Sequence, residues 1–156
     1  MKKNLKKVAA MMAAAAMVVG AMGTLQVSAE ENMVQSFLTG KPVAESVGRQ
    51  RPIAMMYNNI QAALPQSGIS NAEVVYEAPV EGGITRLLGI HEDYQNLERM
   101  GSVRSCRDYY IYFAREFDAY YMHFGQAVYA LELLNHPTTL NIDGLRSGSS
   151  AYYRSD

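Results

Sequence analysis

The chain has a single cysteine, no tryptophan and, beyond its first 29 residues, a single lysine. Cys106 is the only cysteine among 156 residues, so no intrachain disulfide can form and stability must come from a packed core. The part of the chain beyond residue 29 contains nine arginines but only one lysine, Lys41. This bias towards arginine suits bidentate recognition of carboxylate or phosphate. The lack of tryptophan removes the usual stacking platform for sugars, although eleven tyrosines partly replace it.

Long apolar runs are confined to the N-terminus. Lysines at positions 2, 3, 6 and 7 precede an apolar run over 8–23, and small residues follow at 27–29, which predicts a secretory signal peptide over 1–29. The run is short and rich in alanine, so we expect membrane contact only transiently, through the signal peptide. A lipoprotein needs a cysteine directly after the cleavage point, where Glu30 stands. The expected product is therefore secreted and associated with the cell envelope, without a lipid-attachment cysteine.

The net charge of the expected mature chain differs from that of the whole sequence. All 15 acidic residues lie after Ala29, whereas four of the 14 basic residues precede it, so the mature chain carries 10 − 15 = −5. A mildly acidic protein does not offer the broad basic patch that nucleic acids require. We therefore expect no nucleic-acid partner.

The order of the predicted elements indicates a mixed α/β (α+β) fold. Residues 30–50 are polar and contain Gly and Pro, which predicts a flexible tether. A domain over 51–156 follows, with a buried strand at 51–58, a hairpin over 73–91, a helix from Ser105 to 117, a strand at 119–124, a helix at 126–134 and a short strand at 140–142. This order predicts a mixed sheet with a hairpin and two or more packing helices. The chain ends without a closing element, so we expect the sheet to be incomplete at its C-terminus.

The hairpin carries charged residues on both strands. Gly82-Gly83 supplies the turn between Val74-Val75-Tyr76 and the branched residues from Ile84 onward. If the turn has two residues, Glu77 lies opposite Arg86. An ion pair of this kind contributes only about 0.2–1 kcal/mol, so a structural role and a functional one are both open.

A second charged stretch lies at the expected start of the 105–117 helix. Arg104, Arg107 and Asp108 would share one face of a continuing helix, where Arg104 can pair with Asp108. Alternatively, if Ser105 caps the helix, its free N–H groups and the two guanidinium groups converge on an anion such as phosphate or carboxylate. The same helix would place Cys106 on the apolar stripe, where thiols are inert.

Several motifs carry a resemblance to a known family. They are Arg51-Pro52-Ile53-Ala54, Pro65-Gln66-Ser67-Gly68, the stretch 74–86, Val103-Arg104-Ser105, Arg107-Asp108-Tyr109-Tyr110, and His123 with Gly125. Together they resemble the YerB-like family of exported bacterial proteins, which are described as lipoproteins and carry a domain of unknown function. The chain departs from the family pattern at Cys106, where a small residue is expected, at Asn58, where Asp is common, and in lacking the lipid-attachment cysteine. The resemblance implies no established activity, and it implies a C-terminal portion that this chain lacks.

Two hypotheses for the function follow from these residues. The first is binding of a polar or anionic molecule of the cell wall, with Arg86, Arg104, Arg107, Asp108, Glu81 and Asn59 as ligand-binding residues. The second is hydrolysis of envelope glycan or peptide, with Glu77 and His123 as acid and base. Neither hypothesis requires a cofactor. The three histidines have no metal-ligand spacing, so no metal site is predicted.

Overall fold

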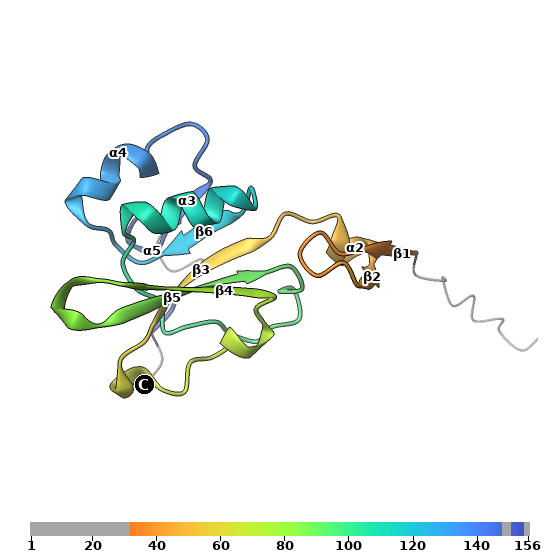
Figure 1. Ribbon diagram of the computed structural model, residues 1–156, viewed down its shortest axis with the longest axis horizontal. Helices are drawn as coiled ribbons and strands as arrows, with labels where there is room; N and C mark the ends of the chain where they lie inside the picture. The colour runs from red at the N-terminus through yellow and green to blue at the C-terminus, as the bar shows by residue number, and fades with distance from the viewer. Residues whose placement is uncertain (1–31, 148–150, 155–156) are drawn as a thin grey trace, which may run out of the picture. The chain divides into compact units, whose positions relative to one another are not determined.

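The computed structural model describes residues 32–147 and 151–154 (Figure 1). The predicted signal peptide over 1–29 therefore lies outside the described residues. Within the described part of the chain, no helix is long and apolar enough to cross a membrane.

The main structure is a five-stranded sheet in the order β4-β5-β3-β6-β7. Its strands are β3 (Ile53–Asn58), β4 (Val74–Pro79), β5 (Thr85–His91), β6 (Tyr120–His123) and β7 (Asn141–Asp143). β5 is antiparallel to both β4 and β3, whereas β3, β6 and β7 run parallel. The predicted mixed sheet and α+β class are thus confirmed.

The remaining elements are short, apart from one helix of nine residues. They are β1 (Met33–Gln35), β2 (Pro42–Ala44), α2 (Glu45–Gly48), α3 (Asp108–Glu116), α4 (Leu131–Leu134), α5 (Gly144–Ser147) and the 3₁₀ turns η1 (Gln61–Ala63), η2 (Ile69–Asn71), η3 (Glu81–Gly83) and η4 (Val128–Ala130).

β3 lies at the centre of the sheet because its sequence suits burial on both faces. Pro52 stands just before the strand, where its missing N–H is tolerated, and five of the six strand residues are buried. Ala54 and Met56 belong to the core cluster, which also includes residues of α3. Because side chains alternate along a strand, Met55 and Tyr57 face the opposite side of the sheet.

The hairpin is confirmed, but its predicted register is wrong. Ala78 pairs with Arg86, and Glu77 pairs with Leu87. The reason is the length of the connection: Val80 N–H donates to Ile84 O at 2.8 Å, and η3 lies between them instead of a two-residue turn. The side-chain period of a strand is two residues, so a shift of one residue moves Glu77 away from Arg86.

α3 covers one face of the sheet through aromatic residues. Its buried residues are Tyr110, Ile111 and Ala114, which follow the three- and four-residue spacing of a helix face. The Tyr76 ring of β4 stacks on Phe113, with 4.6 Å between ring centroids and 7° between ring planes. Figure 1 shows α3 lying across the sheet, with α4 beyond it. α3 therefore fixes the hairpin relative to the parallel strands.

The prediction of a flexible tether over 30–50 is wrong for residues 32–50. β1 and β2 pair antiparallel, and α2 follows directly. Ser36 is buried, and its hydroxyl donates to the buried carboxylate of Glu92, which also accepts the Phe37 N–H at 3.2 Å. This anchor joins residues 56 positions apart, so the polar composition of the segment gave no sign of it.

Candidate functional site

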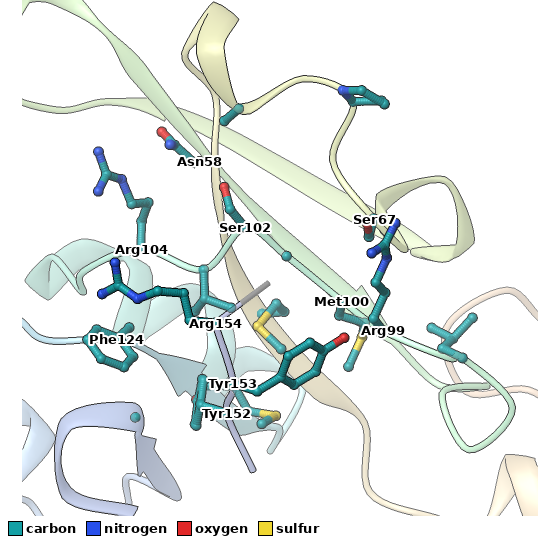
Figure 2. A pocket seen from close by; sticks show the side chains of 18 of the residues that line it. Asn58, Ser67, Arg99, Met100, Ser102, Arg104, Phe124, Tyr152, Tyr153 and Arg154 are labelled. Atoms are coloured by element: carbon teal, nitrogen blue, oxygen red, sulfur yellow. The ribbon is translucent and has the colours of Figure 1, made fainter. Parts of the chain in front are cut away.

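A pocket of about 1180 Å³ lies at the carboxyl ends of the three parallel strands (Figure 2). It is reached by Asn58 at the end of β3, Phe124 directly after β6 and Gly144 directly after β7. The segment 97–104, residues 151–154 and most of the segment 60–67 also line it. In α/β sheets, ligands commonly bind just outside the carboxyl ends of parallel strands. The pocket is therefore the first place in the molecule to look for a ligand.

Three arginines line this pocket, and all three are exposed. They are Arg99, Arg104 and Arg154. None of the three makes a side-chain hydrogen bond or ion pair within residues 32–147 and 151–154. Figure 2 shows Arg104 and Arg154 on one side of the pocket and Arg99 on the other. The pocket wall thus carries positive charge that neighbouring carboxylates do not neutralise, although Glu98 also lines it.

The backbone holds Arg104 next to β3 and β6. Its N–H donates to Met56 O at 3.0 Å, and its carbonyl accepts the N–H of Phe124 at 3.1 Å. Tyr57 also forms a bridge with Val103. The segment that carries Arg104 is therefore fixed to the sheet, while the side chain itself remains free.

Of the predicted residues Arg86, Arg104 and Arg107, the last two lie close enough to Arg86 for their charges to act on it. Arg86 is 9% exposed, and one of its Nη atoms donates to Ser105 O. Burial lowers the pKa of the Arg86 guanidinium, and the positive charges of Arg107 and Arg104 lower it further. The three side chains nevertheless face different surroundings, because only Arg104 lines the pocket.

The carboxylate of Glu81 forms an ion pair with the guanidinium of Arg107. The Arg107 Nε atom lies 2.8 Å and 2.9 Å from the two Glu81 carboxylate oxygens, and Nη2 lies 2.5 Å from Oε2. The Tyr129 hydroxyl donates to the same carboxylate at 2.8 Å. The Arg107 and Tyr129 hydrogen bonds lower the pKa of Glu81 to about 2. The hairpin tip and the start of α3 therefore meet through an ion pair that already satisfies Arg107.

The start of α3 differs from the prediction. The helix begins at Asp108, and Arg107 is the N-cap residue with extended backbone angles, φ −125° and ψ 153°. Ser105 is therefore not the cap, and Arg104 does not share a helical face with Asp108. The Asp108 carboxylate instead accepts the N–H of Tyr109 at 2.9 Å. Asp108 thus accepts a backbone hydrogen bond within the first turn of its own helix.

Glu77 and His123 do not meet. Glu77 is exposed on β4, where its carboxylate accepts hydrogen bonds from Thr85 Oγ1 at 2.5 Å and Asn59 Nδ2 at 3.1 Å. β5 and β3 lie between β4 and β6, which separates the two residues by about 14 Å at a strand spacing of about 4.8 Å. The predicted acid and base therefore lack a shared site.

His123 is enclosed by the fold. It is fully buried, with Nδ1 2.8 Å from Gly125 O and Nε2 2.7 Å from Asn141 Oδ1. The Asp143 carboxylate lies 3.8 Å from Nδ1 and accepts the Gly125 N–H at 3.0 Å. One ring nitrogen thus holds the loop after β6 and the other contacts β7, which is a structural arrangement.

Cys106 is fully buried, as its apolar position predicts, although it precedes α3. Burial raises the pKa of the Cys106 thiol to about 12, so the reactive thiolate is scarce at neutral pH. The described residues contain no group of three or more His, Cys, Asp or Glu side chains that could hold a metal ion.

Sequence reasoning missed several residues of the pocket. The sequence does not predict Arg99, Phe124, Tyr153 and Arg154 as site residues, and it marks Asn58 only as a departure from the family pattern. Asn58 and Phe124 had a usable signal, because each stands at the carboxyl end of a predicted strand. Arg99 and Arg154 lie in irregular segments, for which the sequence carries no comparable pattern.

The fold and pocket define an α+β domain with an open ligand-sized site at one sheet edge. Comparison with known proteins assigns the family: residues 38–156 match the family described as "Protein of unknown function (DUF3048) N-terminal domain". The chain belongs to this family. The predicted boundary at residue 51 thus lies inside the matched region.

One curated relative is "Putative lipoprotein YerB" of Bacillus subtilis (strain 168). It is 38% identical over 119 residues, which cover 76% of this chain and 36% of the relative. The crystal structure of the B. subtilis YerB protein matches with a TM-score of 0.74 and 36% identity, covering 79% of this chain and 42% of that one. The chain therefore spans about a third of the length of the curated relative that it matches.

Proposed function

We propose that this protein works outside the cytoplasm and binds an anionic ligand of the cell envelope in the pocket at the carboxyl ends of β3, β6 and β7. The observation that carries the proposal is the set of three exposed arginines on the pocket wall, Arg99, Arg104 and Arg154, whose side chains have no partner among the described residues. Guanidinium groups bind carboxylate and phosphate through paired hydrogen bonds, and free ones lose no internal partner on binding.

The size of the pocket supports an extended ligand. Its volume of about 1180 Å³ is above the usual range for small-molecule sites, about 300–1,000 Å³. Arg99 and Arg104 lie on different sides of it (Figure 2), so a ligand with several anionic groups contacts both. A single small anion would engage only one side.

The location outside the cytoplasm is supported by two independent features. The N-terminal sequence has the composition of a secretory signal, and the B. subtilis relative is described as a lipoprotein. Mass spectrometry of protein recovered from the medium and the envelope fraction should find a mature N-terminus at Glu30. A cytoplasmic protein that keeps its first 29 residues would contradict this part of the proposal.

Hydrolysis is the weaker hypothesis. It requires Glu77 and His123 at one reaction centre, whereas the sheet order separates them and both His123 ring nitrogens face hydrogen-bond partners. The three-arginine pocket needs no such pair, so binding accounts for more of the observed geometry.

Inorganic polyphosphate is a suitable probe, because it presents repeated anionic groups and nothing else. We expect titration calorimetry at low salt to detect binding, and Arg104→Ala to weaken it at least about tenfold, since a hydrogen bond to a charged group contributes about 1.5–3 kcal/mol. Arg115→Ala is the matched control: it removes the same charge from an exposed site at the end of α3, outside the pocket. Equal weakening by both substitutions would mean that only net charge matters and would refute the pocket.

A further inference from the structure

The Phe124 ring is braced on the pocket wall in a fixed position. It is 42% exposed, although it directly follows the fully buried His123. It meets the Tyr152 ring edge-on, with 6.0 Å between centroids and 70° between planes. The Tyr152 hydroxyl in turn donates to Ile142 O at 2.8 Å. The second ring is thereby tied to β7 and supports the first from the side.

Gly144 provides the space in which Phe124 lies. A Cβ atom at Gly144 would lie 2.4 Å from Phe124 Cδ2, closer than non-bonded carbon atoms approach, and 3.0 Å from Cε2. Phe124 therefore rests against the backbone of residue 144, and any side chain there would push the ring out. The part of the ring that is not covered by Gly144 and Tyr152 remains available to a ligand.

This ring is next to the guanidinium of Arg104, which has no partner in the described part of the chain. The Phe124 N–H donates to Arg104 O at 3.1 Å, so the two residues are neighbours across the backbone. Figure 2 shows both side chains on the same side of the pocket, together with Arg154. Tyr153, which is 70% exposed, adds a second aromatic surface to the lining. The wall thus combines flat apolar surface with positive charge.

We infer that the ligand is an acidic saccharide, in which a sugar ring packs on Phe124 while a carboxylate or phosphate group binds Arg104. The apolar C–H face of a pyranose suits an aromatic face, and the adjacent anionic group suits a guanidinium. This inference rests on the proposed function and narrows its ligand class: a simple polyanion would use the arginines but would gain nothing from the braced ring.

Three probes separate the contribution of sugar-ring packing from that of anion binding. They are oligogalacturonate as a carboxylate saccharide, polyphosphate as a polyanion without sugar rings, and maltohexaose as a neutral saccharide. An oligosaccharide that carries phosphate groups forms a fourth arm and distinguishes phosphate from carboxylate as the anionic group. We expect Phe124→Leu to weaken binding of at least one acidic saccharide about tenfold and to leave polyphosphate binding unchanged. Arg104→Ala should weaken both. Maltohexaose should bind more weakly than either acidic saccharide.

Further variants show whether a loss of saccharide binding comes from the Phe124 ring or from a general loss of folding. Phe124→Tyr keeps an aromatic face and should retain saccharide affinity, whereas Gly144→Ala should displace the ring and behave like Phe124→Leu. Phe37→Leu, at a phenylalanine that is 76% exposed and outside this pocket, is the matched control and should have no effect. Thermal unfolding of each variant establishes that it is folded before titration.

The outcomes distinguish the two proposals. If polyphosphate binds through Arg104 but Phe124→Leu changes no saccharide affinity, the saccharide inference is wrong and the anion-binding function stands. Binding of none of the anionic probes in an Arg104-dependent way would overturn both. Equal binding of neutral and acidic saccharides would overturn the role of the arginine and leave only a ring-stacking surface.

Discussion

Removing the Tyr110 hydroxyl tests how α3 holds the hairpin. Tyr110 is fully buried, and its hydroxyl lies 2.6 Å from Arg86 O and 2.9 Å from Ala78 O and accepts the Ala78 N–H at 3.1 Å. A hydroxyl has one proton, so it donates to one carbonyl at a time. Tyr110→Phe therefore removes about one donated and one accepted hydrogen bond. At about 0.5–1.5 kcal/mol each, we expect the free energy of unfolding to fall by about 2 kcal/mol.

Urea unfolding followed by circular dichroism measures this change. With a slope of about 2 kcal/mol per M for a domain of this size, the midpoint should fall by about 1 M. Tyr112→Phe is the control, because Tyr112 lies two positions further along α3, is 56% exposed and makes no side-chain hydrogen bond within the described residues. Its effect should stay within about 0.5 kcal/mol. If both variants shift the midpoint equally, the hydroxyl does not hold the hairpin and the packing described here is incorrect.

Three other predictions concern single side chains. Glu81 has an ordinary pKa of 4.5 that Arg107 lowers to about 2, so the stability it contributes is present above pH 4.5 and is lost as pH falls towards 2. When the free energy of unfolding is measured at decreasing pH over this range, it should fall less for Glu81→Gln than for the wild type. Ser36→Ala removes the hydroxyl that donates to Glu92, and limited proteolysis should then cut residues 33–48 faster than in the wild type. Leu88→Ala, at a residue with 0% exposure in β5, should lower the free energy of unfolding by about 2–5 kcal/mol in denaturant titration.

Local patterns predicted the sheet well, and contacts between distant residues explain what they missed. β3, the hairpin and β6 have apolar or branched runs with clear ends, so the mixed sheet could be predicted. The pairing partner of Glu77 depends on the length of the connection between β4 and β5. A two-residue turn at Gly82-Gly83 is predicted, whereas the structure has the three-residue η3. The fold of residues 33–48 depends on Glu92, far along the chain, which no local pattern reveals.

The candidate site was predictable only in part. Arg104 was identified from its position beside the 105–117 stretch, and it does line the pocket. Arg107 was grouped with it on the assumption of a helix starting at Ser105. The actual start at Asp108 leaves Arg107 extended and paired with Glu81. Helix boundaries are the least certain feature of a sequence-based prediction, and here the boundary decided which guanidinium remains free.

The central strand of the sheet precedes both of its neighbours in the chain. A ribosome delivers β3 first, and its two edges stay unpaired until β5 arrives on one side and β6 on the other. An apolar strand with open edges is a template for aggregation during synthesis. One edge closes once residues through 91 have emerged and β5 has paired, and the second closes only once residues through 123 have emerged and β6 has paired. A nascent chain that stalls between these two points therefore presents a half-covered strand, and chaperone protection matters most over that interval.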